Sequence, residues 1–288
     1  MTSVSERGAS AESIQHHYDV GNAFYALWLD ESMTYSCALW QGHDDSLAAA
    51  QARKIDYLAG MAGVGKGHRV LDIGCGWGST MRRLVTEHGA DHVTGLTLSE
   101  AQARHVEELG DPRLHVRVQD WADFVADEPY DAAISIGAME HFVKFGWDRS
   151  QKVAGYRRFF QKCHDSLKPG AGFALQTIGK GNVKLDEQGL KETLFIMEHI
   201  FPESDPPRLA EIMHAAEKLF EVEYVVNHRQ HYARTCAAWL DTLRANSAAA
   251  AEITGPEKVA VYEAYLEASI RQFQLGHANL YRIQLRRV

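Results

Sequence analysis

The 288-residue sequence has no apolar run near the roughly 18 residues that a membrane-spanning helix needs. Its start, Met-Thr-Ser-Val-Ser-Glu-Arg, lacks the apolar segment of a secretory signal peptide. Basic residues are fewer than acidic ones, and the net charge of −8 argues against binding to nucleic acid and against adsorption by charge to an anionic membrane. We therefore expect a cytoplasmic protein with no transmembrane segment and no nucleic acid partner.

Cysteine is also scarce, and its four residues (Cys37, Cys75, Cys163 and Cys236) lie far apart with no Cys-x-x-Cys pair. In a chain of this length, that spacing is typical of reduced thiols and not of a disulfide framework. The 15 histidines form neither a His-Glu-x-x-His motif nor a Cys/His cluster. The sequence therefore predicts no metal site.

What the chain does contain is a regular alternation of apolar runs and helical stretches. Strands are expected at residues 68–74, 92–98, 114–119, 131–137, 172–178, 221–227 and 279–286. Helices are expected at about residues 46–60, 80–88, 99–109, 156–167, 235–247 and 258–274, with further helices between 190 and 216 broken at 201–207. This alternation predicts an α/β fold, with a mostly parallel seven-stranded sheet, an antiparallel last strand and helices on both faces.

We expect three parts along the chain. Residues 1–62 are rich in aromatic residues and are interpreted as a helical lid, residues 63–180 as a nucleotide-binding core, and residues 181–288 as a helical cap on the acceptor side that also supplies the last two strands. In open parallel sheets the ligand lies beyond the carboxyl ends of the strands, so the pocket is expected there.

The motif Asp72-Ile-Gly-Cys-Gly-Trp-Gly78 joins a buried strand to a helix. Glycine can adopt positive φ and lets a ligand approach the backbone closely, and the helix start adds unpaired N–H groups. The spacing is tighter than in the dinucleotide fingerprint, and no Lys-Ser/Thr pair follows as in a phosphate loop. The motif predicts a nucleotide cradle, with an ordinary strand–turn–helix as the alternative.

Several further motifs occur in order along the chain. They are His17-Tyr-Asp-Val-Gly-Asn-Ala-Phe-Tyr25, Met33-Thr-Tyr-Ser-Cys-Ala38, Thr97-Leu-Ser-Glu-Ala-Gln102, Ser135-Ile-Gly-Ala-Met-Glu-His141, His231-Tyr-Ala-Arg-Thr235 and a final Leu-Tyr-Arg strand. Together with the glycine motif, they make the chain similar to the cyclopropane fatty acid synthase and mycolic acid methyltransferase family. The resemblance implies a Rossmann-like class I methyltransferase fold and S-adenosylmethionine (SAM) as the cofactor, with S-adenosylhomocysteine (SAH) as its product.

The resemblance also implies which residues bind SAM. They are Tyr35, Ser36, Asp72, Gly74, Gly76, Thr97, Leu98, Gln102, Asp120, Trp121 and Ile136. Tyr35 and Ser36 would offer hydroxyls to the carboxylate, Gln102 would accept from the ribose, and Asp120 would accept from the adenine amino group. Glu100 is the rival for the ribose, but an acid in the first turn of a helix is favoured there in any case.

For the chemistry, the resemblance implies an electron-rich C=C bond that takes the methyl group, and a carbocation that aromatic rings or buried negative charge stabilise. The implied catalytic residues are Glu140, Tyr232, Cys37 through its backbone, and residue 176, placed with Ile136 around a bicarbonate ion; Tyr18 is a second candidate for the aromatic wall. The family often has histidine where this chain has Gln176. Glutamine cannot carry positive charge, which argues against bicarbonate and against cyclopropane formation.

Two other departures lie on the expected acceptor side. Residues 143–155 form an insertion that carries Phe145 and Trp147, and the segment Phe201-Pro-Glu-Ser-Asp-Pro-Pro207 stands where relatives often have Gly-Gly. Loops at this end of a sheet line ligands. We expect both to reshape the acceptor pocket, with a longer surface loop as the alternative for the insertion.

The sequence therefore predicts a SAM-dependent C-methyltransferase that acts on an unsaturated lipid-like or isoprenoid-like acceptor. Three alternatives stay open: a cyclopropane synthase on an unsaturated acyl chain, a small-molecule N-methyltransferase, and a SAM-binding protein without catalysis. An acyl carrier partner is also open, with Arg157-Arg158 as the short basic candidate for contact with an acidic carrier. A homo-oligomer is neither predicted nor excluded.

Overall fold

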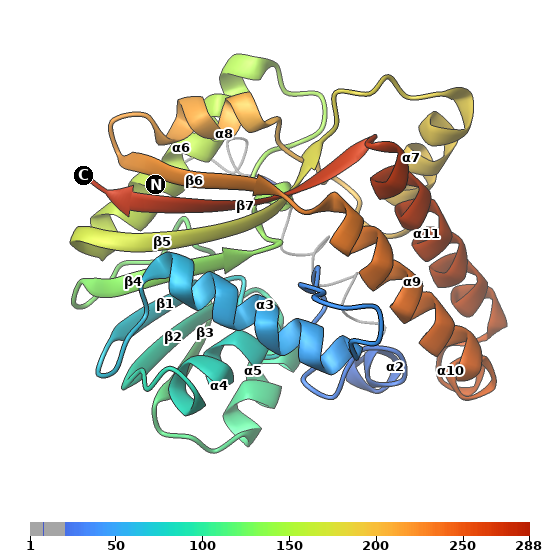
Figure 1. Ribbon diagram of the computed structural model, residues 1–288, viewed down its shortest axis with the longest axis horizontal. Coiled ribbons are helices and arrows are strands. Elements are labelled where there is room, and N and C mark those ends of the chain that lie inside the picture. The colour runs from blue at the N-terminus through green and yellow to red at the C-terminus, as the bar shows by residue number, and fades with distance from the viewer. Residues whose placement is uncertain (1–7, 9–20) are drawn as a thin grey trace.

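The computed structural model describes residue 8 and residues 21–288, and a seven-stranded sheet forms its centre (Figure 1). The strand order is β3-β2-β1-β4-β5-β7-β6. The strands are β1 (Arg69–Ile73), β2 (His92–Thr97), β3 (Leu114–Val118), β4 (Tyr130–Ile136), β5 (Leu167–Lys180), β6 (Phe220–Asn227) and β7 (Ala278–Arg287). All seven overlap the strands predicted from the sequence, which confirms the fold class.

The direction of the strands follows the prediction as well. The five strands β1 to β5 are paired in parallel, whereas β7 runs antiparallel to both β5 and β6. Within the β5–β7 pair, Gln176 lies directly opposite Arg282.

Helices cover both faces of the sheet. They are α2 (Asn22–Ala26), α3 (Leu47–Ala62), α4 (Ser79–Thr86), α5 (Glu100–Glu108), the short 3₁₀ helix η2 (Met139–His141), α6 (Arg149–Ser166), α7 (Glu187–His199), α8 (Leu209–Ala216), α9 (Arg229–Ala245), α10 (Ser247–Thr254) and α11 (Pro256–Leu275). One core cluster joins α3, α4 and α5 to β1 and β2, and another joins α6 and α8 to β4 and β5. The central strand β4, which has helices on both faces, is buried along most of its length, whereas the edge strands β3 and β6 are partly exposed.

A third core cluster lies at the ends of the strands. It packs aromatic residues of the N-terminal region, such as Trp28, against α9 and α11, where Trp239 and Tyr262 are buried. In Figure 1, α7, α9, α10 and α11 gather at the right-hand end of the sheet, next to α2. The regions interpreted as lid and cap therefore share one core over the strand ends.

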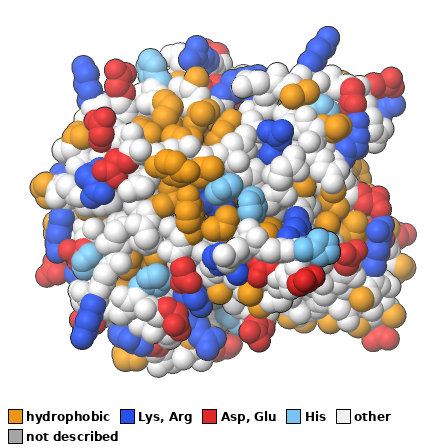
Figure 2. Space-filling view, viewed as in Figure 1, with side chains coloured by type: hydrophobic (Ala, Val, Ile, Leu, Met, Phe, Trp, Pro, Cys, Tyr) orange, Lys and Arg blue, Asp and Glu red, His pale blue; other side chains and the backbone are white. Residues whose placement is uncertain are grey.

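The surface seen in the same orientation is mixed. Figure 2 shows hydrophobic and histidine side chains near the middle of this face and charged side chains around its periphery. No helix within residues 21–288 is both long enough and apolar enough to cross a bilayer.

Helix α6 differs from the prediction. It begins at Arg149 and not at residue 156, because Asp148 caps it: the Asp148 carboxylate accepts from the Gln151 N–H, and the Gln151 side chain accepts from the Asp148 N–H. Such a capping box is a strong helix start. Residues 149–155 of the predicted inserted loop are thus the first turns of α6.

Helix α9 is also longer than predicted, since it begins at Arg229 and not at residue 235. The whole motif His231-Tyr-Ala-Arg-Thr235 therefore lies on one helix. Tyr232, Thr235 and Cys236 fall on its buried side, three and four residues apart. The tetrad Ala248–Ala251, which has no polar periodicity, is helical too and belongs to α10.

Candidate active site

One cavity of about 390 Å³ lies at the carboxyl ends of the parallel strands. Its size is within the range of small-molecule sites. Every residue that the resemblance assigned to SAM lines it, namely Tyr35, Ser36, Asp72, Gly74, Gly76, Thr97, Leu98, Gln102, Asp120, Trp121 and Ile136. These residues come from five separate stretches of sequence, and the parallel sheet brings them together because its strands all end at the same edge.

The glycine motif forms a wall of bare backbone. Gly74 has a φ of +85°, and a Cβ there would lie 2.8 Å from the Cβ of Ala138. Gly76 has a φ of +54°, and a Cβ there would meet no atom within 4 Å. Only glycine adopts such conformations without strain, so this wall fits a ligand that lies against the main chain.

The N-terminal motif supports the same wall. The indole Nε1 of Trp77 donates to the Asn22 side-chain oxygen at 2.8 Å. Two motifs that are 55 residues apart in sequence therefore meet in the structure. His16, His17 and Tyr18 precede this contact and lie outside the described residues, so the predicted position of Tyr18 in the aromatic wall stays a prediction.

Polar groups beyond β2 form the side of the cavity predicted for the ribose. The Thr97 hydroxyl donates to the Gln102 amide oxygen at 2.7 Å, and Ser99 caps α5 by accepting from the Gln102 N–H. The Gln102 oxygen, which the resemblance implies as an acceptor for the ribose, thus already accepts one hydrogen bond from the protein and keeps a second lone pair. Glu100 is exposed at the start of α5 and does not line the cavity, in keeping with its interpretation as a helix-start acid.

The end predicted for adenine is built after β3. One carboxylate oxygen of Asp120 accepts from the Ala122 N–H at 2.9 Å. The ring of Trp121 packs on Phe142 at 4.9 Å and edge-on against Phe159 at 5.4 Å. Trp121 therefore packs against the core and also lines the cavity.

At the opposite end, the hydroxyls of Tyr35 and Ser36 already have protein partners. Tyr35 donates to the Tyr265 hydroxyl at 3.0 Å, and the Ser36 Oγ accepts from the Lys54 ammonium at 3.0 Å. The sequence interpretation missed Lys54, which lines the cavity and is 1% exposed. In the sequence it is one of several polar residues on an amphipathic helix, and only packing reveals that it is buried.

Glu140 is the central residue among those predicted to be catalytic. It is 5% exposed, and its Oε1 accepts from the Ile178 N–H at 2.5 Å. Its Oε2 has no hydrogen-bond partner among the described residues. Burial raises the pKa of Glu140 to about 7, although the Ile178 N–H opposes this shift. The adjacent residue, His141, lines the cavity, whereas Glu140 does not.

Cys37 and Gln176 meet through a residue that the sequence interpretation did not select. Arg282 is fully buried, and it donates to the Gln176 side-chain oxygen at 2.7 Å and to the Cys37 carbonyl at 3.0 Å. A third hydrogen bond goes to Nδ1 of His228 at 2.7 Å. The positive charge that Gln176 lacks is therefore present one hydrogen bond away.

Tyr232 lies near this group. Its ring stacks on Phe273 at 4.5 Å, and its pKa is raised chiefly by burial and further by nearby groups that include Cys37 and Glu140. Cys37, Glu140, Gln176 and Tyr232 are all buried, and none of them is among the residues that line the described cavity. The structure thus gathers them in a second layer behind the cavity wall.

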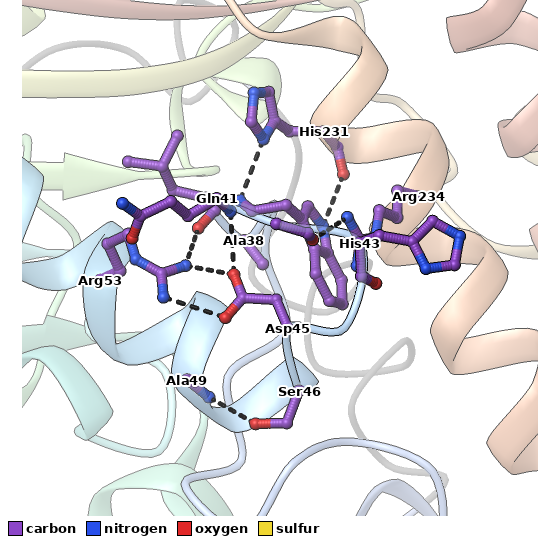
Figure 3. Close-up of polar contacts among 12 residues, drawn as sticks. Ala38, Gln41, His43, Asp45, Ser46, Ala49, Arg53, His231 and Arg234 are labelled. Carbon is purple, nitrogen blue, oxygen red and sulfur yellow. Dashed lines mark hydrogen bonds and ion pairs between the residues drawn. The ribbon is translucent and has the colours of Figure 1, made fainter.

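The motif on α9 fixes the segment that follows Ser36 (Figure 3). Nδ1 of His231 accepts from the Trp40 N–H at 3.0 Å. The Arg234 guanidinium donates to the Gly42 carbonyl at 2.7 Å and lies 4.1 Å from the centre of the Trp40 ring. On the other side, Arg53 of α3 donates to the Leu39 carbonyl at 2.8 Å. The motif therefore contributes mainly to holding this segment in place.

Of the two acceptor-side departures, the 201–207 segment borders the site. Phe201 lines the cavity. The Asp205 N–H donates to the Glu140 carbonyl at 2.9 Å, and the Tyr156 hydroxyl donates to the Asp205 carbonyl at 3.1 Å. In contrast, Phe145 is 63% exposed, and Trp147 packs against the core. The segment therefore positions Glu140, whereas the insertion serves packing.

The Asp205 carboxylate, which is 2% exposed, forms ion pairs with Lys152 and Lys180. We expect Asp205→Ala to lower the free energy of unfolding by about 3 kcal/mol, because it leaves two partly buried ammonium groups without a counter-charge. Urea denaturation measures this change. The matched control is Asp127→Ala, which removes an acid that is 74% exposed and paired with Arg117; its cost should stay below about 1 kcal/mol. Equal losses of unfolding free energy in the two variants would contradict the inference that the Asp205 ion pairs hold the 201–207 segment in place.

The predicted basic pair does not form a common surface. Arg157 donates to the carbonyls of Ala215 and Glu217 at 3.2 and 2.9 Å and thereby caps α8, while Arg158 lines the cavity. The four cysteines are buried and unpaired. No group of three potential metal ligands occurs within the described part of the chain.

The sequence and the fold were compared with known proteins. The model of the mycolic acid cyclopropane synthetase family matches residues 5–283. Cyclopropane mycolic acid synthase MmaA2 of Mycobacterium tuberculosis is 36% identical over 286 residues, covering 93% of this chain and 94% of the relative.

Solved structures point to the same family as the sequence comparisons. The structure of MmaA2 from Mycobacterium tuberculosis superposes with a TM-score of 0.89 at 32% identity, covering 97% of this chain and 99% of that one. Mycolic acid cyclopropane synthase CmaA1, complexed with SAH and CTAB, gives a TM-score of 0.88 at 32% identity over 98% of this chain and 100% of that one. Coclaurine N-methyltransferase bound to SAH gives 0.78 at 18% identity over 96% of this chain and 86% of that one, a likeness of fold alone.

Proposed function

Since the chain belongs to the mycolic acid cyclopropane synthetase family and is a SAM-dependent enzyme, we propose that it methylates a carbon of a C=C bond in an unsaturated, lipid-like acceptor. The acceptor class follows from what the relatives' names say they act on. An isoprenoid-like acceptor has the same reacting bond and is included in this proposal.

The burial of Glu140 and its unpaired carboxylate oxygen are the main support for this proposal. Glu140 is a buried acid with one oxygen unpaired among the described residues, and the next residue along the chain, His141, lines the cavity that we assign to SAM. Methyl addition to an alkene leaves positive charge on carbon, and a buried carboxylate stabilises such charge far better than water-exposed groups do. An acceptor that already carries a lone pair would not need this group.

When bound, SAM supplies a methyl group activated by its sulfonium. The chain's own residues would then act in three ways. The glycine wall and the Ser36 region would orient the cofactor, the buried second layer would exclude water, and Glu140, within that layer, would stabilise the developing charge electrostatically. With a pKa of about 7, Glu140 is also able to accept a proton: the C–H bond next to the cation breaks, its electrons form the new C=C bond, and the proton moves to the carboxylate.

A cyclopropane synthase is the second candidate, and Arg282 favours it. The case against a bicarbonate base depended on the lack of charge at Gln176. Arg282 lies opposite Gln176 in the β5–β7 pair and donates to its side chain at 2.7 Å. The surroundings of Gln176 therefore fit an anion better than the sequence indicates, although the Cys37 carbonyl is already an acceptor for Arg282.

Products distinguish the candidates. We expect the enzyme, given SAM with a trideuterated methyl group and a panel of unsaturated lipids and terpenoids, to yield a methyl-branched alkene that keeps all three deuterons. A cyclopropane keeps two, because one leaves the methyl carbon when the ring closes. Mass spectrometry reads the deuterium count, and NMR of the product identifies the ring or the branch.

The same assay also tests the rival activities. A methylated amine would point to N-methyltransfer, and the complete lack of transfer to any acceptor would favour a SAM-binding protein without catalysis. A cyclopropane whose yield rises with added bicarbonate would replace the leading proposal by the second candidate. An acyl carrier protein that presents the acceptor stays part of the proposal, and it is tested by offering the acyl chain both free and bound to the carrier.

The four buried thiols support a cytoplasmic location.

A further inference from the structure

The cavity that we assign to SAM shares one wall with the third core cluster, which packs the N-terminal region against α9 and α11. We call this wall the partition. Among the described residues, five side chains line the cavity and also lie in or against this cluster; they are Met33, Tyr35, Trp77, Ile200 and Phe201. The Tyr35 ring contacts those of Trp28 and Trp239, with ring centres 5.4 and 5.2 Å apart. The partition therefore separates the cofactor cavity from a packed aromatic core.

Met33 differs from the other four members of the partition. The Trp77 indole and the Tyr35 hydroxyl are each tied by a hydrogen bond to another segment, and the Phe201 ring packs edge-on against a tyrosine of α11 at 5.8 Å. Ile200 is β-branched, which restricts its first side-chain torsion. Methionine is unbranched, has three rotatable bonds and fills irregular spaces. Met33 is therefore the member whose side chain changes shape most easily.

The backbone of Met33 is also unusual, because its φ is +57°. The turn is fixed by Asp30, whose carbonyl accepts from the Met33 N–H at 2.8 Å and whose carboxylate accepts from the N–H groups of Ser32 and Thr34, both at 3.1 Å. Glycine would adopt this conformation without strain. A strained side-chain-bearing residue on a cavity wall is an indication of function, since the strain is retained for the sake of the side chain.

The chemistry places the acceptor at the partition. The reacting C=C bond has to meet the methyl group on a side from which water is excluded, and the positive charge that develops on carbon is stabilised by aromatic faces. The glycine wall and the polar groups beyond β2 and β3 occupy other sides of the cavity. The aromatic core lies behind the partition, so the substituents of the reacting bond compete for space with the partition side chains.

We propose that Met33 is a specificity-determining residue, whose side chain sets how much bulk the acceptor can carry next to the reacting C=C bond. This inference rests on the proposed transfer to an unsaturated acceptor and on the placement of SAM. An unbranched cis alkene fits beside the Met33 side chain, whereas a trisubstituted isoprenoid alkene requires that side chain to turn away.

A ratio of two rates tests this assignment. The probes are an unbranched cis alkene and a trisubstituted isoprenoid alkene of similar chain length, each used with labelled SAM. The kcat/KM for the bulky probe divided by that for the slim probe does not depend on the fraction of folded enzyme. We expect Met33→Ala to raise this ratio about 10-fold and Met33→Phe to lower it about 10-fold, because each changes the space in an apolar pocket.

Two further variants control for general disturbance of the site. Met33→Leu conserves volume and should fold like the wild type, but its branched end adapts less well, so the ratio should fall about threefold. Met61→Ala makes the same truncation at a methionine of α3 that is buried to a similar degree, at 6% exposure against 8% for Met33, and that does not line the cavity. It should leave the ratio as in the wild type.

The possible results lead to different conclusions. An unchanged ratio in Met33→Ala and Met33→Phe, or a shift of both in the same direction, would overturn the inference and leave the proposed methyl transfer intact. A wild-type enzyme that methylates neither probe nor any other alkene would contradict the proposed function, and the inference with it.

Discussion

Gly76→Leu abolishes cofactor binding in a protein that stays folded: this is the largest effect that we expect of any single substitution. Gly76 lines the cavity, and a Cβ there meets no protein atom within 4 Å, so the leucine side chain extends into open space at the cavity wall. A ligand that lies against this backbone would collide with it, and we expect the affinity for SAH to fall about 100-fold or more. Isothermal titration calorimetry measures the loss.

The substitution also strains the backbone, and this effect needs its own control. A leucine at a φ of +54° costs about 1–2 kcal/mol of stability. Gly110→Leu provides the match, because Gly110 has a φ of +66°, is exposed, lies away from the cavity, and would place a Cβ with no other atom within 4 Å. Both variants should melt at similarly lowered temperatures, whereas only Gly76→Leu loses SAH. Retained SAH affinity in Gly76→Leu would mean that the cofactor binds elsewhere.

The second large effect is expected for Glu140→Gln, which keeps the shape of the side chain and removes its charge. We expect turnover to fall about 100-fold or more, because the substitution removes a charge whose effect is largest in the transition state. SAH affinity should change little, since Glu140 does not line the cavity. Turnover with labelled SAM and an accepted substrate measures the first quantity, and calorimetry the second.

The pH profile gives an independent signature. Burial raises the pKa of Glu140 to about 7, so the carboxyl group is neutral below that pH and ionised above it. Wild-type turnover should therefore decrease as the pH falls through about 7, and Glu140→Gln should lack this decrease. If Glu140→Gln kept some activity with the same pH profile as the wild type, the titrating group would not be Glu140.

Stability changes in the opposite direction, which helps to separate the two effects. In the unfolded chain the group ionises near 4.5, whereas in the folded protein it keeps its proton up to about 7. The folded state thus binds more protons between these values, and Glu140 makes the protein less stable as the pH rises through this interval. Glu140→Gln removes that loss of stability. A loss of activity in this variant above pH 7 would therefore not come from unfolding.

Glu100→Gln is the matched control for this substitution. It makes the same chemical change in an exposed acid at the start of α5, which does not line the cavity. We expect its turnover to equal that of the wild type. A large loss in Glu100→Gln would revive this residue as the partner of the ribose.

Much of the fold could be predicted because its signals are local. Strand and helix periodicity indicated all seven strands and the antiparallel last strand. The differences are the early starts of α6, α9 and β5 and the unpredicted helix α10. Helix α6 began early because of the Asp148–Gln151 capping box, whose residues lay within the segment interpreted as an insertion. A capping box is a local signal, so this error was avoidable.

The candidate site could be predicted from the sequence only in part. The residues assigned to SAM all line one cavity. Those from Asp72 to Ile136 lie at or just after the carboxyl ends of parallel strands, where the sheet topology brings them together, whereas Tyr35 and Ser36 come from the segment before α3. The charges behind the cavity wall could not be predicted in this way. Arg282 is one of several arginines near the end of the chain, and Lys54 is one of several polar residues on α3.

The sequence by itself thus determined the order of the strands along the chain, the glycine wall and the family, since these depend on residues that are neighbours in the chain. Only the tertiary structure decided that Lys54 and Arg282 are buried, that Arg282 reaches Gln176, and that Glu140 is held by the 201–207 segment. The physical reason is desolvation: the energy of a charge depends on which distant segments exclude water from it, and this exclusion exists only once the strands and the cap have packed.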